Sequence, residues 1–233
     1  TAPDAFRELL AFPALLEYKF SNFVDETSHR SQRMSTRSPF IIVSLAACAA
    51  ASLLPALAAA LTITVDSNTD GAVNLLTAPT SLREAIQIAN NTPGSDVIDL
   101  SGLTGNVAIT QGTALPTISD SVAITGPGAS TLTVTRTSGT NYRIFQVSSG
   151  TVSISGIGIS NGTATDGGAV LISGGTVSID ASYLNNNFSF GGNNTSGGGA
   201  IRVNGGSLAL NGTTIANNGA NNDGGAIYIA QGS

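Results

Sequence analysis

The chain has 233 residues with nine lysines and arginines against 14 aspartates and glutamates, and it contains one cysteine, one histidine and no tryptophan. After residue 60 there is no lysine, and four arginines face nine carboxylates, so this segment is acidic and has no basic stripe for nucleic acid. A single cysteine excludes a disulfide framework and a cysteine-rich zinc site, and a single histidine excludes a histidine-built metal centre within this sequence.

Residues 1–33 precede Met34, the only methionine of the chain, and contain two short helical patterns. An export leader does not normally follow such a segment. We therefore expect translation to begin at Met34 and residues 1–33 to be absent from the mature protein. The alternative is a cytoplasmic extension on an anchored protein. His29 lies in this stretch and receives no functional role.

A positively charged start at Met34 is followed by an uncharged apolar run and then by small residues. This order is typical of a secretory signal peptide, which we place at residues 34–58, with cleavage after Ala58 and with Ala60 as the second choice. Two alternatives stay open. The apolar run is long enough for a retained membrane anchor, and the sequence up to Cys48 resembles a bacterial lipobox, in which that cysteine would be acylated.

Residues 59–80 predict a first strand and a linker, and residues 81–90 predict a short amphipathic helix. Serine and glutamate stand at the spacing of a capping box, and apolar residues recur along one helical face. Such a helix ahead of a β-helix can cover the open apolar end of the first coil. The residues assigned to this cap are Ser81, Leu82, Arg83, Glu84, Ala85 and Ile86.

Short segments in which apolar and small polar residues alternate follow over residues 91–233. Three of them align at intervals of 25 and 31 residues, which is the range of stacked repeats. No helical pattern separates them, so we predict an all-β fold, a right-handed parallel β-helix in which each strand pairs with its equivalent one coil further on. Val152, Val177 and Leu208 should then stack inside the lumen. The alternating segments are 106–110, 121–125, 151–155, 176–180 and 207–211.

Asparagine recurs at one position of the three aligned units, shortly after an apolar column. Asparagine at an inward bend can hydrogen-bond the turn backbone and the asparagine of the next coil. We therefore predict an asparagine ladder formed by Asn161, Asn186 and Asn217. The alternative is that these residues are ordinary turn asparagines.

Threonines at alternate positions, Thr131, Thr133 and Thr135, predict a row of hydroxyl groups on one strand. Flat hydroxyl arrays can order water or sugars. The alternative is an ordinary solvated sheet face.

The segment from Thr80 to Ile86 resembles the CSLREAI motif near the start of many exported bacterial β-helix proteins, with Thr80 where those proteins often have cysteine. The Gly-Gly-Ala-Ile units at 198–201 and 224–227 resemble the GGAI repeats of polymorphic outer-membrane proteins, a group of autotransported adhesins. The resemblance covers residues 61–233. It implies a pectin-lyase-like solenoid that is exported to the cell surface or outer membrane, and it implies little about activity because this fold has many functions.

Asp166 and Asp223 are the candidate catalytic carboxylates, because each precedes a Gly-Gly pair at an equivalent position two coils apart. They would lie about 10 Å from each other, which is marginal for an inverting glycosidase and too far for a retaining one. The alternative is that both residues form turns. We expect no cofactor and no metal centre; the alternative is Ca²⁺ held by loop carboxylates such as Asp166 and Asp180.

These observations predict a secreted or cell-surface β-helical protein that acts as a non-catalytic, adhesin-like or structural passenger. Its partners would be host or environmental glycans or surface proteins, with no nucleic acid and no membrane contact except through the signal peptide or a downstream anchor. The alternative is a polysaccharide lyase or glycoside hydrolase of the pectin-lyase-like fold, with its active site outside or at the end of this fragment. We expect an N-terminal fragment because residues 224–233 predict another strand after them, which the sequence does not reach.

Overall fold

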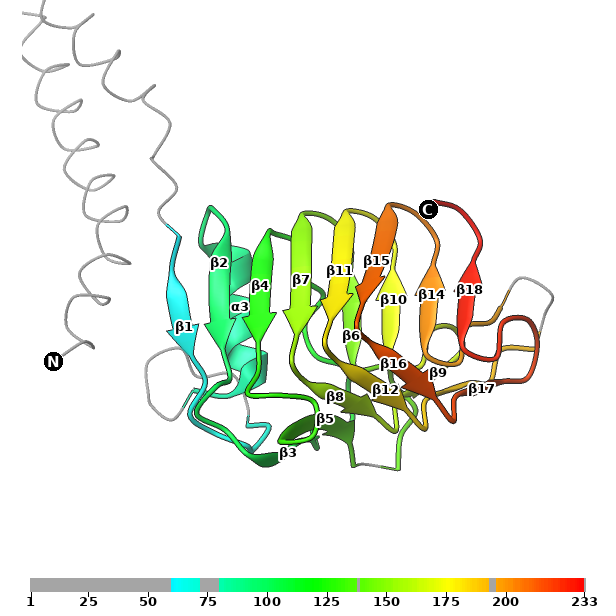
Figure 1. Cartoon of the computed structure of the whole chain (residues 1–233), viewed down its shortest axis with the longest axis horizontal. Coiled ribbons are helices and arrows are strands. Elements are labelled where there is room, and N and C mark those ends of the chain that lie inside the picture. Colours follow the sequence, from blue (N-terminus) through cyan, green and yellow to red (C-terminus); the bar gives the residue numbers. More distant parts are fainter. Residues whose placement is uncertain (1–59, 72–79, 138, 193–195, 233) are drawn as a thin grey trace, which may run out of the picture. The chain divides into compact units, whose positions relative to one another are not determined.

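The computed structural model describes residues 60–71, 80–137, 139–192 and 196–232. Residues 1–33 and the predicted signal peptide, 34–58, lie outside the described residues. The described residues wind into a stack of coils (Figure 1), which confirms the predicted parallel β-helix. No helix within these ranges is long and apolar enough to span a bilayer.

One strand of each coil adds to sheet A, the long row of parallel arrows in Figure 1. Equivalent residues pair directly, so that Val152, Val177 and Leu208 lie on three neighbouring strands. Val152 and Val177 are fully enclosed, and Leu208 is partly buried and packs against the same core, as predicted. The strands of sheet A are β1 (Thr62–Thr64), β2 (Asp96–Asp99), β4 (Val122–Thr125), β7 (Thr151–Ser155), β11 (Thr176–Asp180) and β15 (Ser207–Asn211).

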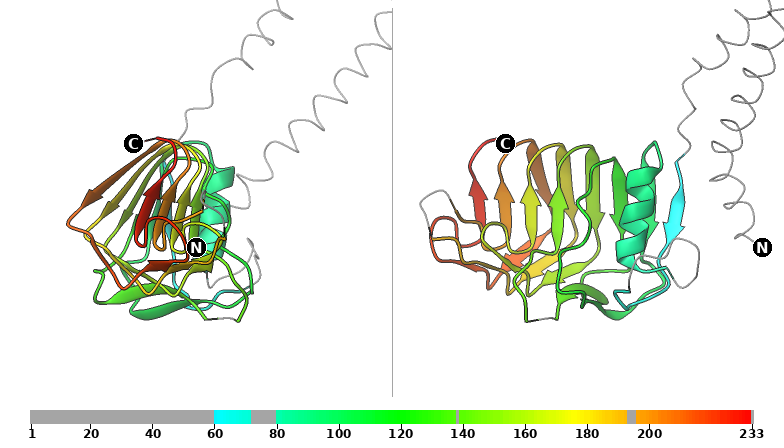
Figure 2. Two further views of the ribbon diagram at one scale, coloured as in Figure 1. Left: turned by 90° about the vertical axis from the view of Figure 1, so that its right-hand side faces the viewer. Right: turned by 180° about the vertical axis from the view of Figure 1, so that it is seen from behind.

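Three further sheets form the other walls of the coils, and the view along the stack in Figure 2 shows successive coils lying over one another. Sheet B consists of β3 (Gly105–Ile109), β5 (Leu132–Arg136), β8 (Gly158–Ser160), β12 (Tyr183–Asn185) and β16 (Thr214–Ala216). Sheet C consists of β6 (Phe145–Val147), β10 (Val170–Ile172), β14 (Ile201–Val203) and β18 (Ile227–Ile229). Sheet D consists of β9 (Thr163–Ala164), β13 (Phe188–Ser189) and β17 (Gly219–Ala220).

The lumen is filled by aliphatic side chains from the inward positions of these strands. Ile154 and Ile179 from sheet A and Ile159 and Leu184 from sheet B are completely buried. Each such side chain contributes about 1.5–3 kcal/mol when it leaves water. The alternation in the sequence is therefore the signal that specifies which face of each strand points inward.

The predicted helix forms as α3 (Leu82–Asn91), one residue later than expected, with Ser81 as its N-cap. Both hydrogen bonds of the predicted capping box are present between Ser81 and Glu84. The apolar face is buried, as predicted, and packs against β1 and β2.

The helix closes a side wall of the first coil rather than lying across its open end. The Asn90 side chain donates to the Thr117 carbonyl (2.7 Å) and accepts from the Ser119 amide (2.9 Å). That neighbouring segment in turn pairs with sheet C, through a bridge between Ile118 and Val147. In Figure 2 the helix accordingly continues the row of sheet C strands. A helix can take this place because its apolar stripe faces the lumen as a strand's inward residues do.

The asparagine ladder is present, but one residue later than predicted. Asn161, Asn186 and Asn217 do occupy equivalent positions. Each adopts a left-handed backbone conformation, with φ of 60°, 55° and 55°, and each is exposed. The prediction that these three side chains point inward is therefore wrong. The left-handed residue reverses the local alternation, so that the following residue faces the coil interior.

The inward position is held by Asn187 and Asn218, with Gly162 as the equivalent residue one coil earlier. The Gly162 amide donates to Asn187 Oδ1 (2.9 Å), and the Asn187 amide donates to Asn218 Oδ1 (2.9 Å). Asn187 Nδ2 donates to the Ile159 carbonyl (3.1 Å), and Asn218 Nδ2 donates to the Leu184 carbonyl (2.9 Å). The side-chain amide of each asparagine thus pairs with one backbone N–H and one backbone carbonyl of the preceding coil.

We expect Asn187→Ala to lower the free energy of unfolding by about 2 kcal/mol or more, because it leaves buried backbone groups without partners. Asn187 is 1% exposed, whereas its neighbour Asn186 is exposed. The matched control is Asn186→Gly, which keeps the left-handed conformation and should change stability by less than about 0.5 kcal/mol. Urea-induced unfolding measures both variants. Equal losses would contradict the assignment of the ladder to Asn187.

Candidate functional site

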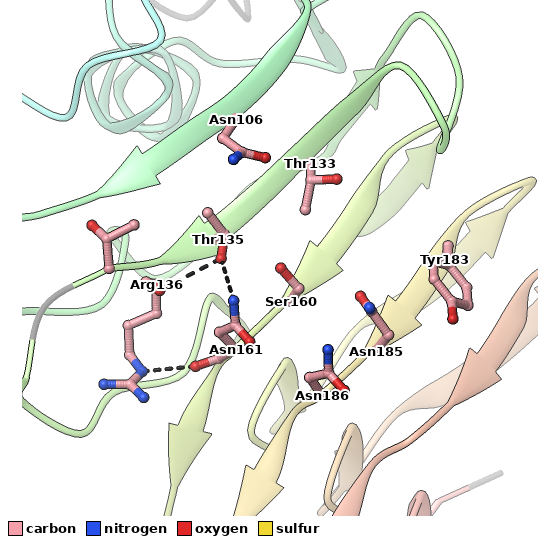
Figure 3. Close-up of a pocket in the computed structure, with 10 residues that line it drawn as sticks. Asn106, Thr133, Thr135, Arg136, Ser160, Asn161, Tyr183, Asn185 and Asn186 are labelled. Carbon is pink, nitrogen blue, oxygen red and sulfur yellow. Dashed lines mark hydrogen bonds between the residues drawn. The ribbon is translucent and has the colours of Figure 1, made fainter.

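A groove of about 450 Å³ lies on the outer face of sheet B, and Figure 3 shows the side chains that line it. Because side chains alternate along a strand, outward residues of neighbouring strands form rows across the coils. One row contains Asn106, Thr133, Gly158 and Tyr183. The second row contains Thr135, Ser160 and Asn185. Of the three threonines predicted to form a row, Thr133 and Thr135 belong to this two-dimensional array, whereas Thr131 precedes β5 and does not line the groove.

Gly158 interrupts the first row between a hydroxyl group and an aromatic ring. It pairs with Thr133 on one side and with Tyr183 on the other. A Cβ atom at Gly158 would come within 2.5 Å of the Thr133 Oγ1 atom. The missing side chain therefore lets Thr133 keep its position and leaves the outer surface open beside Tyr183.

Arg136 and Asn161 form the end of the groove. Arg136 Nε donates to the Asn161 carbonyl (2.7 Å), and its Nη1 donates to the Thr140 carbonyl (2.7 Å). The guanidinium also lies over the ring of Tyr142, 5.8 Å from its centroid. Asn161 Nδ2 donates to Thr135 Oγ1 (3.0 Å). These contacts fix the turn after β8 and place a permanent positive charge beside the polar rows.

The two candidate catalytic carboxylates do occupy equivalent positions, with Gly197 between them. The Gly167 amide donates to the Gly197 carbonyl (3.2 Å), and the Gly198 amide donates to the Asp223 carbonyl (3.1 Å). Asp166 Oδ1 accepts a hydrogen bond from the Gly197 amide (3.3 Å) and forms an ion pair with Arg202 Nη1 (3.0 Å). Neither aspartate lines the groove on sheet B.

A second charged cluster surrounds Asp166 beside the outer face of sheet C. Arg202 is 7% exposed and lies over the ring of Tyr228 on the neighbouring strand, 4.9 Å from its centroid. Burial lowers the pKa of Arg143; the charge of Asp166 opposes this and the charge of Arg202 adds to it. Arginine nevertheless stays protonated in proteins. The cluster thus combines two guanidinium groups with one carboxylate, and its contacts join neighbouring coils.

The two loop carboxylates named as Ca²⁺ candidates do not form a common site. Asp166 binds Arg202, and Asp180 Oδ1 accepts a hydrogen bond from Asn211 Nδ2 (2.6 Å). In the part of the chain that the structure describes, no three acidic, cysteine or histidine side chains gather closely enough to hold a metal ion.

Comparison of the chain with protein-family models, curated proteins and solved structures found no match. The resemblance to exported β-helix proteins therefore depends on the motifs alone. The chemistry of the groove is the remaining basis for a functional assignment. Tyr183 was missed as a site residue, because its place in the groove depends on the strand register and not on any local pattern.

Proposed function

We propose that this chain is the β-helical part of an exported or surface-displayed protein that binds glycans on the outer face of sheet B and does not act on them chemically. The observation that carries the proposal is the pair of in-register rows of hydroxyl and amide groups beside the ring of Tyr183. Host or environmental glycans supply the chemistry that fits it. Export is proposed from the leader pattern at residues 34–58.

Sugars present many hydroxyl groups, each of which can donate and accept hydrogen bonds. Threonine and serine hydroxyls and asparagine amides are neutral groups of the same dual character. Thr135 and Ser160 are only 5% and 6% exposed, so they support the surface from below. The polar groups open to a ligand are those of Asn106, Thr133 and Asn185, on strands of sheet B, in which neighbouring strands follow one another at about 4.8 Å. A regularly repeating polymer can therefore meet equivalent partners along the groove, and the ring of Tyr183 can pack against the apolar face of a sugar ring.

Two features weigh against glycan cleavage, one in the groove and one at the two candidate aspartates. A glycosidase needs a pair of carboxylates beside the scissile bond, and the described residues that line the groove include no carboxylate. Asp166 is engaged by Arg202, and Asp223 lies two coils away from it. A screen of polyuronates and neutral glycans for cleavage tests the lyase or hydrolase alternative. Turnover that is abolished by Asp166→Asn or Asp223→Asn would contradict the proposal.

We expect Tyr183→Ala to weaken glycan binding about fivefold or more, because it removes an aromatic contact worth on the order of 1 kcal/mol. Asn185→Ala should weaken binding similarly through the loss of a polar contact. The matched control is Ser178→Ala, which changes an outward residue of sheet A, outside the groove. A glycan array followed by titration calorimetry provides the affinities. Equal affinities for the Tyr183 variant and the control would place the binding surface elsewhere.

A further inference from the structure

We propose that Asp96 is a receptor for a free α-amino group at Leu61, and hence that the leader is removed after Ala60. The inference depends on the proposed export of the chain. It assigns a processing site and a function for a buried carboxylate that the groove does not use.

Leu61 is held by the fold through both of its backbone groups. Its nitrogen donates to Asp96 Oδ1 (2.8 Å), and its carbonyl accepts from the Val97 amide (2.8 Å). Leu61 also packs against the hydrophobic core, whereas Ala60 is exposed. The boundary between the exposed chain and the packed chain thus falls at the Ala60–Leu61 peptide bond.

Asp96 is the other half of this contact, and only one of its oxygens has a partner. The residue is 1% exposed and occupies an inward position of β2. Asp96 Oδ2 is buried and has no hydrogen-bond partner among the described residues. A buried carboxylate that receives a single neutral donor is costly, because neither its charge nor its second oxygen is compensated.

A free amino terminus at Leu61 would supply what Asp96 lacks. A peptide nitrogen offers one N–H and no charge, whereas an α-ammonium offers three N–H donors and a positive charge. The two oxygens share one carboxyl carbon, so an ammonium at the position of the Leu61 nitrogen can donate to both after a small rotation. The contact then becomes a buried, charge-assisted ion pair.

The step that creates this group is a hydrolysis by the peptidase that removes export leaders. Water adds its hydroxyl to the Ala60 carbonyl carbon and a proton to the Leu61 nitrogen, and the C–N bond breaks. The new carboxyl of Ala60 loses a proton and the new amine gains one at neutral pH. Ala58 and Ala60 provide the small residues at the two positions that such peptidases require; Ala58 lies outside the described residues. The structure therefore favours Ala60, the second choice from sequence alone.

The first test follows processing in vivo. The chain is expressed from Met34 in an exporting bacterium, and the amino terminus of the exported protein is determined by Edman degradation and intact mass. We expect Leu61 as the first residue. A mature protein that begins at Ala59 overturns the proposal. An unprocessed protein that stays in the cytoplasm overturns the export hypothesis instead, and the second test then decides the role of Asp96.

The second test measures stability with defined amino termini. Chains that begin at Leu61 or at Ala59 are released from a cleavable fusion, each with and without Asp96→Asn. We expect the chain that begins at Leu61 to melt about 4 °C or more above the chain that begins at Ala59, and this difference to disappear in the Asp96→Asn pair. Equal melting temperatures for the two chains, or a difference that Asp96→Asn leaves unchanged, overturns the proposal.

Discussion

Replacing Arg83 by methionine is expected to lower the free energy of unfolding by about 3–5 kcal/mol. Arg83 Nε and Nη2 bind the two carboxylate oxygens of Asp70 at 2.6 and 2.9 Å. The side chains of Arg83 and Asp70 are 10% and 1% exposed. Removal of the cation would leave the buried Asp70 carboxylate without a counter-charge, held only by the amides of Thr110 and Gln111 (3.0 and 3.1 Å). It would also free the Ala114 carbonyl, which accepts from Arg83 Nη1 (2.7 Å).

The double variant Arg83→Met with Asp70→Asn separates the charge effect from packing. It removes both charges, so we expect it to lose less stability than Arg83→Met alone. Arg83→Lys keeps the charge but not the two-pronged contact, and should fall between the wild type and Arg83→Met. Urea-induced unfolding gives the three values. A loss below about 1 kcal/mol for Arg83→Met would mean that the pair contributes no more than an exposed salt bridge.

Gly168→Ala is expected to destabilise the stack by about 3 kcal/mol or more, because the added methyl group has no space. A Cβ atom there would lie 2.6 Å from the Gly199 carbonyl oxygen and 2.7 Å from the Phe188 nitrogen, both in the next coil. It would also lie 2.7 Å from the Gly162 carbonyl oxygen of its own coil. These are backbone atoms, so relief requires the coils to separate locally.

The matched control is Gly102→Ala, at an exposed turn where a Cβ atom would meet nothing within 4 Å. We expect this change to alter stability by less than about 0.5 kcal/mol. Thermal and urea-induced unfolding measure both variants. A Gly168 variant as stable as the Gly102 variant would show that neighbouring coils do not approach closely at this corner.

The solenoid and its register could be predicted because each repeat carries its own signal. The alternation around Val152 and Val177 specifies the inward face of each strand, and equal positions in equal repeats then stack. The capping box at Ser81 and Glu84 is likewise a local pattern with a local structure. Features that depend on a few adjacent residues were therefore accessible from the sequence.

The remaining features depend on the path of the chain between strands. The ladder was placed one residue early because the positive φ of Asn186, which sends its side chain outward and Asn187 inward, is not visible in the alternation. The pairing of Asp70 with Arg83 joins a loop to a helix, and no periodicity predicts it. The groove forms only when β5, β8 and β12 pair in register, because this pairing brings Tyr183 beside the hydroxyl groups of the other two strands.

The most direct test of the stacked arrangement is a pair of spin-label distances on the outer face of sheet A. Thr62, Ser178 and Ala209 belong to one row, with Ser178 four strands and Ala209 five strands from Thr62. Electron paramagnetic resonance should give backbone separations of roughly 19 Å between Thr62 and Ser178 and roughly 24 Å between Thr62 and Ala209. The step of 31 positions from Ser178 to Ala209 thus adds only one strand spacing. The stack of parallel coils would be contradicted if the distance from Thr62 to Ala209 exceeded the distance from Thr62 to Ser178 by several strand spacings. It would also be contradicted if the distance to Ala209 were no longer than the distance to Ser178.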